Sequence, residues 1–169
     1  MNIYRIKPVD AINGPGLRMS IWIAGCCNNC PGCWAKETWD PFLGRDWREI
    51  FPEIIEGLKK PTDGVSLLGG DPFYTAMEDD PEQFLEFLKR LREVLGEDRS
   101  IWCWTGYLFE DILQKCPETL KYIDVLVDGK YDKSLRNITL HFRGSSNQRI
   151  IDVRSSMETG EVVELNFEE

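Results

Sequence analysis

Short apolar runs alternate with amphipathic stretches along the chain, a pattern that predicts strands alternating with helices. Strands are predicted over residues 3–6, 17–24, 65–68, 100–104, 123–127 and 139–142. Residues 162–167 predict either a final edge strand or a tail. Strands joined by helices are typical of βαβ units, so we expect an α/β fold with a mostly parallel sheet.

The clearest helix is predicted over residues 81–95. Its apolar side chains recur at spacings of three and four, namely Phe84, Leu88, Leu91 and Leu95. A second helix is predicted over residues 47–60 with Asp46 as its N-cap, although Pro52 suggests a later start. Residues 108–115 predict a third, shorter helix.

Length and composition narrow the class of protein. The chain has 169 residues, of which 42% are hydrophobic, so it can form the core of one domain. A complete eight-stranded α/β barrel takes roughly 250 residues, which exceeds this length. The formal net charge of −9 argues against nucleic acid as a partner, because phosphate binding needs clustered lysine and arginine.

Cysteine usage indicates the compartment. The chain has six cysteines, and neither a secretory signal nor a run of about 20 apolar residues is apparent. We therefore expect a cytoplasmic protein that does not enter a membrane. In that reducing environment clustered cysteines indicate metal ligands or redox groups rather than disulfides.

Three cysteines, Cys26, Cys30 and Cys33, follow the strand predicted at residues 17–24. Soft thiolates select iron–sulfur clusters, zinc or copper(I). A cubane cluster normally takes four cysteines, so three leave one iron open to a substrate. Two alternatives are a dithiol redox pair in Cys30-Pro-Gly-Cys33 and a zinc site. The zinc site would be completed by one of four other residues, Cys27, Cys103, Cys116 or His141.

Three further loops come directly after predicted strands. They begin at Gly69, Thr105 and Asp128. Parallel sheets assemble their sites at the carboxyl ends of strands, so one shared site is expected for all four loops. The pair Gly69-Gly70 is either a plain turn or a place where the backbone approaches a ligand closely.

Other conspicuous residues have simpler interpretations. Asn13-Gly-Pro-Gly16 predicts a turn, which could also form part of the site wall. Cys103 is expected in the core, Cys116 at a helix end and Cys27 at the surface, and His141 is given no role. The six tryptophans are assigned to the core, except Trp34 beside the third cysteine. Residues 143–149 have the composition of a polar surface loop.

Taken together, these segments resemble the activating enzymes of anaerobic (class III) ribonucleoside-triphosphate reductases, within the radical S-adenosylmethionine (SAM) superfamily. The matching stretches are Asn13-Gly-Pro-Gly16, Cys26 to Trp34, Gly69-Gly-Asp-Pro72, Trp104-Thr-Gly-Tyr107, Val125-Leu-Val-Asp-Gly129 and Arg143-Gly-Ser-Ser-Asn-Gln148. The resemblance covers residues 2–152 of a single domain spanning residues 1–169. Residues 73–80 and the tail 153–169 depart from the family pattern.

The resemblance implies an incomplete (βα) barrel of the radical SAM type, open on one side. It implies a [4Fe-4S] cluster held by Cys26, Cys30 and Cys33, with SAM bound at the open iron. The implied cofactor-binding residues are Gly32, Trp34, Gly69, Gly70, Asp71, Thr105, Asp128, Arg143, Asn147 and Gln148. No general acid or base is required, because the cofactors supply the chemistry.

The resemblance also implies two protein partners. A flavodoxin-like donor would supply one electron, and the anaerobic ribonucleotide reductase would receive a glycyl radical near its C-terminus. The competing hypotheses are an activase of another glycyl-radical enzyme, a radical SAM enzyme acting on a small molecule, and a zinc-binding interaction module.

Overall fold

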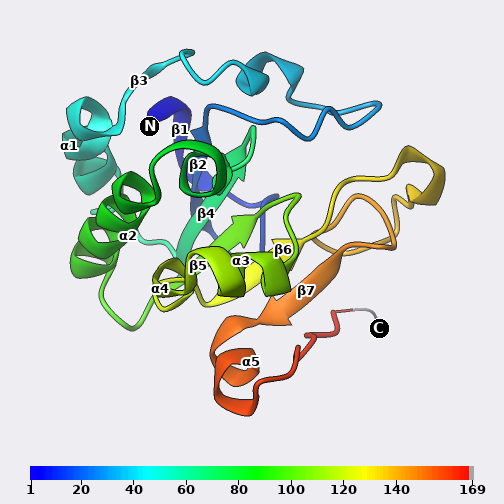
Figure 1. Cartoon of the computed structure of the whole chain (residues 1–169). Helices are drawn as coiled ribbons and strands as arrows, with labels where there is room; N and C mark the ends of the chain where they lie inside the picture. Colours follow the sequence, from blue (N-terminus) through cyan, green and yellow to red (C-terminus); the bar gives the residue numbers. More distant parts are fainter. Residues whose placement is uncertain (168–169) are drawn as a thin grey trace.

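A computed structural model describes residues 1–167 (Figure 1). The strands are β1 (Asn2–Asp10), β2 (Arg18–Ile23), β3 (Arg45–Asp46), β4 (Gly64–Gly69), β5 (Ser100–Trp104), β6 (Val125–Asp128) and β7 (Arg149–Asp152). The α-helices are α1 (Trp47–Gly57), α2 (Pro81–Leu95), α3 (Phe109–Lys115), α4 (Pro117–Leu120) and α5 (Val153–Thr159). Short turns of 3₁₀-helix occupy Lys36–Trp39 and Lys133–Leu135, and a π-helix occupies Thr75–Asp79.

The seven strands form one mixed sheet in the order β3-β1-β2-β4-β5-β6-β7. Strands β2, β4, β5 and β6 pair in parallel, whereas β1, β3 and β7 pair antiparallel at the two sides. The expectation of a mostly parallel sheet is therefore correct for the centre and wrong for the edges. The edge pairings arise because β1 reaches β2 through a turn, and β7 returns beside β6 without a crossover helix.

Local sequence explains where the helices begin. The Asp80 side chain accepts hydrogen bonds from the backbone N–H groups of Glu82 and Gln83, which fixes the start of α2. Asp46 caps α1 in the same way, through the N–H of Arg48. Helix α1 begins at Trp47 and contains Pro52, so the suggested later start is wrong. Pro52 lies in the second turn, where it removes only the bond to the carbonyl of Arg48.

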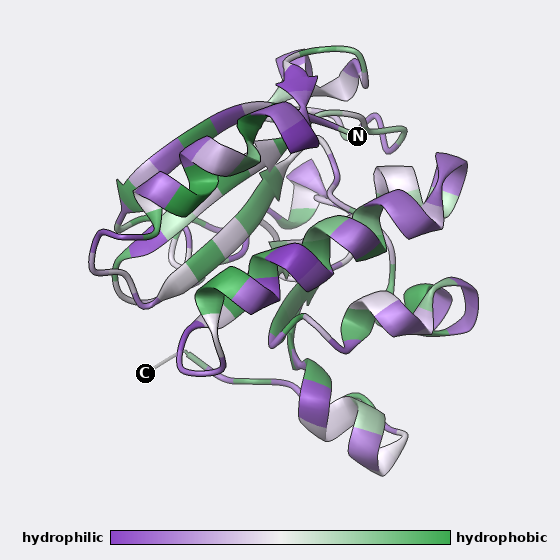
Figure 2. Cartoon of the chain, turned by 90° about the vertical axis from the view of Figure 1, so that its left-hand side faces the viewer, coloured by the Kyte–Doolittle hydropathy of each residue, from purple (hydrophilic) through white to green (hydrophobic). Residues whose placement is uncertain are grey.

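The main core lies between one face of the sheet and the helices. Alternate residues of the central strands, such as Ile21, Leu67 and Cys103, are fully buried on this face. Hydrophobic and hydrophilic bands alternate along α2 (Figure 2), and its buried side includes Phe84, as predicted. The opposite face of the sheet carries a smaller cluster around Trp102.

Two predictions for the C-terminal third need correction. Residues 139–142 form turns rather than a strand, and Phe142 has a left-handed φ of 57°. Its ring packs against Trp102 at 5.4 Å, so the apolar run covers the small cluster instead of joining the sheet. Residues 162–167 make only one bridge, between Glu164 and Ile151, and therefore form a tail along β7. The segment before this tail is α5, a helix absent from the predictions.

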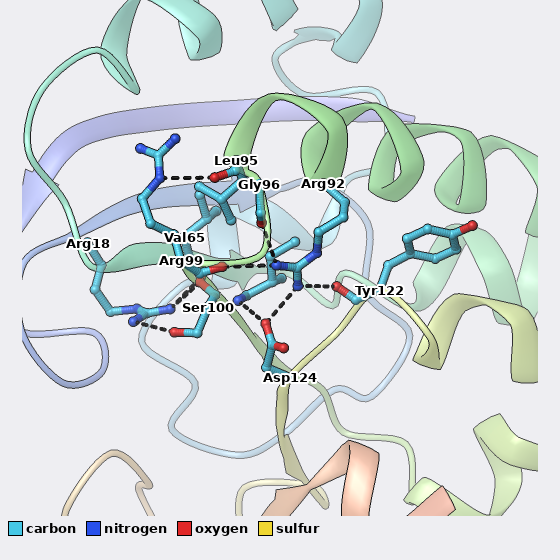
Figure 3. Close-up of polar contacts among 10 residues, drawn as sticks. Arg18, Val65, Arg92, Leu95, Gly96, Arg99, Ser100, Tyr122 and Asp124 are labelled. Carbon is cyan, nitrogen blue, oxygen red and sulfur yellow. Dashed lines mark hydrogen bonds and ion pairs between the residues drawn. The ribbon is translucent and has the colours of Figure 1, made fainter.

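Arginine side chains close the amino ends of the central strands (Figure 3). The Arg18 guanidinium is 1% exposed and donates to the Ser66 hydroxyl at 2.8 Å, to the Val65 carbonyl at 2.9 Å and to the Ser100 carbonyl at 2.8 Å. Arg92 joins α2 to β6 through a 2.7 Å contact with Asp124. Burial lowers the pKa of Arg18 to about 10, so this residue stays charged at neutral pH.

Replacing Arg18 with methionine should lower the free energy of unfolding by about 3 kcal/mol, since two buried carbonyls and one hydroxyl lose their donor. Urea denaturation of the metal-free protein measures this loss. Arg154→Met, at an exposed position of α5, serves as the control and should change stability by less than about 0.5 kcal/mol. Equal stabilities of the two variants would show that the Arg18 contacts are unimportant.

Candidate functional site

Four loops converge on one pocket at the carboxyl ends of the parallel strands, as the sequence predicts. The loops follow β2, β4, β5 and β6. Predicted site residues that line the pocket are Cys26, Cys30, Cys33, Trp34, Gly69, Gly70, Thr105 and Gln148. Five of the six segments that carry the resemblance therefore also meet in space.

The loop after β2 presents the three cysteines to this pocket. Cys26, Cys30 and Cys33 are half-buried, and all six cysteines of the chain are free thiols. Burial raises the pKa of Cys26 to about 11 and also raises that of Cys30. Both thiols therefore hold their protons in the metal-free protein, and binding a metal centre would release them.

A buried carboxylate, Asp71, fastens this loop to the sheet. Its side chain is 1% exposed and accepts four hydrogen bonds. The donors are the Asn28 amide at 2.8 Å, the Thr105 hydroxyl at 2.7 Å, the Gly106 N–H at 2.8 Å and the Phe73 N–H at 3.0 Å. Burial raises the pKa of Asp71 to about 6, and the four donors oppose that rise.

The two glycines at the end of β4 serve the packing of the backbone. A Cβ on Gly70 would lie 2.4 Å from the Gly25 carbonyl oxygen and 2.5 Å from the Thr38 carbonyl oxygen. Gly69 has a φ of 121°, and a Cβ there would meet the Ile23 backbone at 2.3 Å. Glycine is thus required because the cysteine loop and the end of β4 touch, whatever ligand the pocket takes.

Several predicted site residues lie outside the pocket lining. Asp71 lies beneath it, and Gly32 is at the outer edge of the cysteine loop beside Lys133. The Asp128 carboxylate is fully buried, but it accepts the Phe109 N–H at the start of α3 and pairs with Arg149 at 2.5 Å.

Two further predicted site residues form hydrogen bonds to other residues of the connection between β6 and β7. Arg143 donates to the Gln148 carbonyl at 2.8 Å, and the Asn147 amide donates to the Lys130 carbonyl at 2.8 Å. Gln148 faces the pocket and also bonds the Gly129 carbonyl at 3.0 Å. This polar segment is therefore an internally bonded loop with one side chain at the site.

The sequence interpretation missed much of the pocket wall. Its apolar lining comes from Trp22, Trp39, Leu68 and Trp104, and its polar lining includes Asn28 and Tyr131. Assigning every tryptophan except Trp34 to the core is correct for Trp47 and Trp102 and wrong for the three that line the pocket. Strand alternation was an available signal, because Trp22, Leu68 and Trp104 face away from the buried Ile21, Leu67 and Cys103.

The simpler interpretations are mostly confirmed. Cys103 and Cys116 are buried in the main core, and Cys27 is exposed. Residues 13–16 do form a turn, but it joins β1 to β2 at the amino end of β2, where the Ser66 hydroxyl donates to the Asn13 carbonyl at 2.5 Å. That turn therefore lies at the opposite end of β2 from the cysteine loop, so the suggestion that it also walls the site is wrong.

The donor set suits a cluster better than a single ion. A structural zinc site needs four ligands about one point. In a cubane cluster each iron takes its own cysteine, so the three thiols that line this pocket would serve three of the four irons. The potential zinc ligands Cys103 and Cys116 are absent from the pocket lining.

Comparison with known proteins agrees with this chemistry. Residues 12–151 match the family model described as a 4Fe-4S single cluster domain. The chain is 40% identical over 152 residues to the anaerobic ribonucleoside-triphosphate reductase-activating protein of Enterobacteria phage T4, an alignment that covers 89% of this chain and 93% of the phage protein. It is 37% identical over 160 residues to the protein of the same name from Escherichia coli K12, covering 91% and 100% of the two chains.

The Vibrio cholerae protein of that name is 36% identical over 154 residues, covering 89% of this chain and 97% of its own length. The class of protein is thus a single-cluster iron–sulfur protein with an α/β fold and a three-cysteine loop. Within that class, the chain belongs to the family of anaerobic ribonucleoside-triphosphate reductase-activating proteins.

Replacing Gly70 with alanine should reduce the iron and sulfide content of the purified protein as well as its affinity for SAM. The new Cβ would push back two backbone carbonyls of the cysteine-loop region, at a cost of about 1–3 kcal/mol. Metal analysis after anaerobic reconstitution measures the effect. Gly96→Ala is the control for backbone strain. It also costs stability, because Gly96 has a φ of 75°, but it lies at the end of α2 with open space around it, so the iron content should stay normal. Normal iron content in Gly70→Ala would refute the packing role of this glycine.

Proposed function

We propose that the chain is a radical SAM activase that generates the glycyl radical of an anaerobic ribonucleotide reductase. The observation that carries this proposal is the pocket itself, where three thiols of one loop meet glycine turns at the strand ends. When bound, the [4Fe-4S] cluster and SAM supply the one-electron cleavage that gives an organic radical able to abstract hydrogen from a glycine of the reductase.

Cys26, Cys30 and Cys33 would hold three of the irons and leave the fourth for SAM. Trp34, Gly69, Gly70, Thr105 and Gln148 line the same pocket and are the proposed SAM contacts. Asp71 would act indirectly. Its carboxylate accepts hydrogen bonds from both Asn28 and Gly106, and so holds the cysteine loop beside the turn after β5. Exclusion of water from the reaction falls to the apolar wall of Trp22, Leu68 and Trp104.

The proposed activity also implies a particular architecture for the sheet and the domain. We propose that the sheet curves around the pocket as an incomplete barrel, since its strand order has two ends, at β3 and β7. The single domain would include the tail after Asp152, because Leu165 and Phe167 pack on the cluster around Trp102.

No helix formed by residues 1–167 has the length and apolar character to cross a bilayer. Six free thiols suit a reducing cytoplasm.

Two protein partners complete the proposed reaction. A flavodoxin-like protein would donate the electron, and the C-terminal glycine segment of the reductase would enter the open side of the pocket. The pocket is only partly enclosed, so the reductase must supply part of the enclosure that shields a radical.

The test mixes the reconstituted protein, SAM, a chemical reductant and the cognate reductase without oxygen. Electron paramagnetic resonance should detect a glycyl doublet that disappears when the reductase's target glycine is replaced by alanine. Cys30→Ala should abolish both the cluster absorbance and the doublet. The control Cys103→Ala, which alters a thiol of the main core, should retain both.

Cleavage of SAM without a doublet on the reductase would contradict the assigned partner. The activase of a different glycyl-radical protein, or an enzyme acting on a small molecule, would then be the better description.

A further inference from the structure

One segment of this acidic protein is basic. Residues 130–144, here called the basic arm, connect β6 to β7 and carry four cations, Lys130, Lys133, Arg136 and Arg143, against the single anion Asp132. The chain as a whole has a formal net charge of −9. Such a local inversion of charge creates a field that attracts acidic partners.

Hydrogen bonds hold the basic arm in one shape. The Asn137 N–H donates to the Gly144 carbonyl at 3.3 Å, and the Ser146 N–H donates to the Leu135 carbonyl at 3.0 Å. At the base, the Asp132 N–H donates to the Ser145 hydroxyl at 3.1 Å. These bonds tie the two legs of the arm together, so the backbone that carries the charges has one shape before any partner arrives.

The basic arm lies directly against the cysteine loop. The Lys133 side chain is 3.4 Å from the position of a Cβ on Gly32, and the Arg136 guanidinium lies 5.9 Å from the centre of the Trp34 ring. Tyr131 and Gly144 line the same pocket as the three cysteines. In Figure 1 the arm and the loop after β2 project from the same side of the sheet.

Three of the four cations of the basic arm are available to a partner. Lys130, Lys133 and Arg136 are exposed, and none of the three pairs with a carboxylate within residues 1–167. Ile138 is 82% exposed at the tip of the arm, and Trp34 is 82% exposed beside it. A cationic surface with a few exposed apolar side chains is typical of a small, transient protein interface.

The other side of the cysteine loop has the opposite charge. The Tyr107 hydroxyl contacts the exposed Cys27 sulfur at 3.3 Å and donates to the Glu78 carboxylate at 2.8 Å. Asp79 and Asp80 follow Glu78 directly. The cysteine loop therefore lies between an acidic segment and the basic arm, and an acidic partner is directed to the arm alone.

We propose that the basic arm is the docking surface for the electron donor, an acidic one-electron carrier protein. This inference rests on the proposed function, which requires such a donor. Electron transfer weakens steeply with distance, so the donor must bind beside the cysteine loop, where the exposed edge at Gly32 and Trp34 meets the arm. One electron leaves the reduced flavin of the donor and enters the cluster, and no atom or proton needs to cross the interface.

The test uses the double variant Lys133→Glu/Arg136→Glu and a reduced acidic flavodoxin as the probe. At low ionic strength, where the Debye length is about 30 Å, its affinity for the flavodoxin should fall at least about tenfold, and so should the rate of cluster reduction. The difference should vanish in about 1 M salt, which screens charges beyond about 3 Å. Reduction by photoexcited deazaflavin, a small reductant, should proceed as in the wild type.

Lys60→Glu/Lys121→Glu is the matched control. It makes the same change of charge at exposed positions that precede β4 and β6, at the other end of these strands from the cysteine loop. Both double variants are also compared at about 0.1 M ionic strength, where the Debye length is about 10 Å. There the flavodoxin affinity of Lys60→Glu/Lys121→Glu should stay within about twofold of the wild type, whereas that of Lys133→Glu/Arg136→Glu should remain reduced.

Two results would overturn the inference. One is wild-type flavodoxin affinity in the Lys133→Glu/Arg136→Glu variant. The other is normal reduction by flavodoxin combined with loss of the glycyl doublet when deazaflavin supplies the electron, which would assign the arm to the reductase. Failure of the proposed function has a different signature, namely no SAM cleavage by the wild-type protein under chemical reduction.

Discussion

The buried carboxylate of Asp71 holds the site together. It lies at the end of β4 and accepts hydrogen bonds from Asn28 after β2 and from Thr105 and Gly106 after β5. A carboxylate accepts at both oxygens, and all four of its partners here are donors. Three loops distant in sequence are thus bonded to one carboxylate, and this anchoring determines where the three cysteines lie.

The two ends of the parallel strands have different roles. At the amino ends, Arg18 and Arg92 satisfy buried carbonyls and close the bottom of the sheet. At the carboxyl ends the loops leave a pocket, with glycines wherever backbones meet.

Much of this could be predicted from the sequence, for identifiable reasons. The three-cysteine spacing and the turns after apolar strands are local signals, and parallel pairing brings them together. The antiparallel edges depend on how β1 and β7 connect to their neighbours, and the apolar runs alone do not show that. Strand alternation separates the tryptophan wall from the core face, but tertiary packing decides that this second face stays open as a pocket. Asp128 looks equivalent to Asp71 in sequence, yet its carboxylate pairs with Arg149 and serves α3. The role of Gly70 was also hidden, since the Gly25 and Thr38 carbonyls come from elsewhere in the chain.

The most direct measurement compares Asp71→Asn with Asp128→Asn by the iron content and SAM affinity of the reconstituted proteins. Both variants turn a fully buried carboxylate into an amide. The NH₂ group of that amide would then face groups that themselves donate hydrogen bonds, so at least one of those bonds is lost. If Asp71 organises the site, Asp71→Asn loses cluster and SAM binding, whereas Asp128→Asn loses stability but keeps both. Wild-type cluster content and SAM affinity in Asp71→Asn would contradict the account.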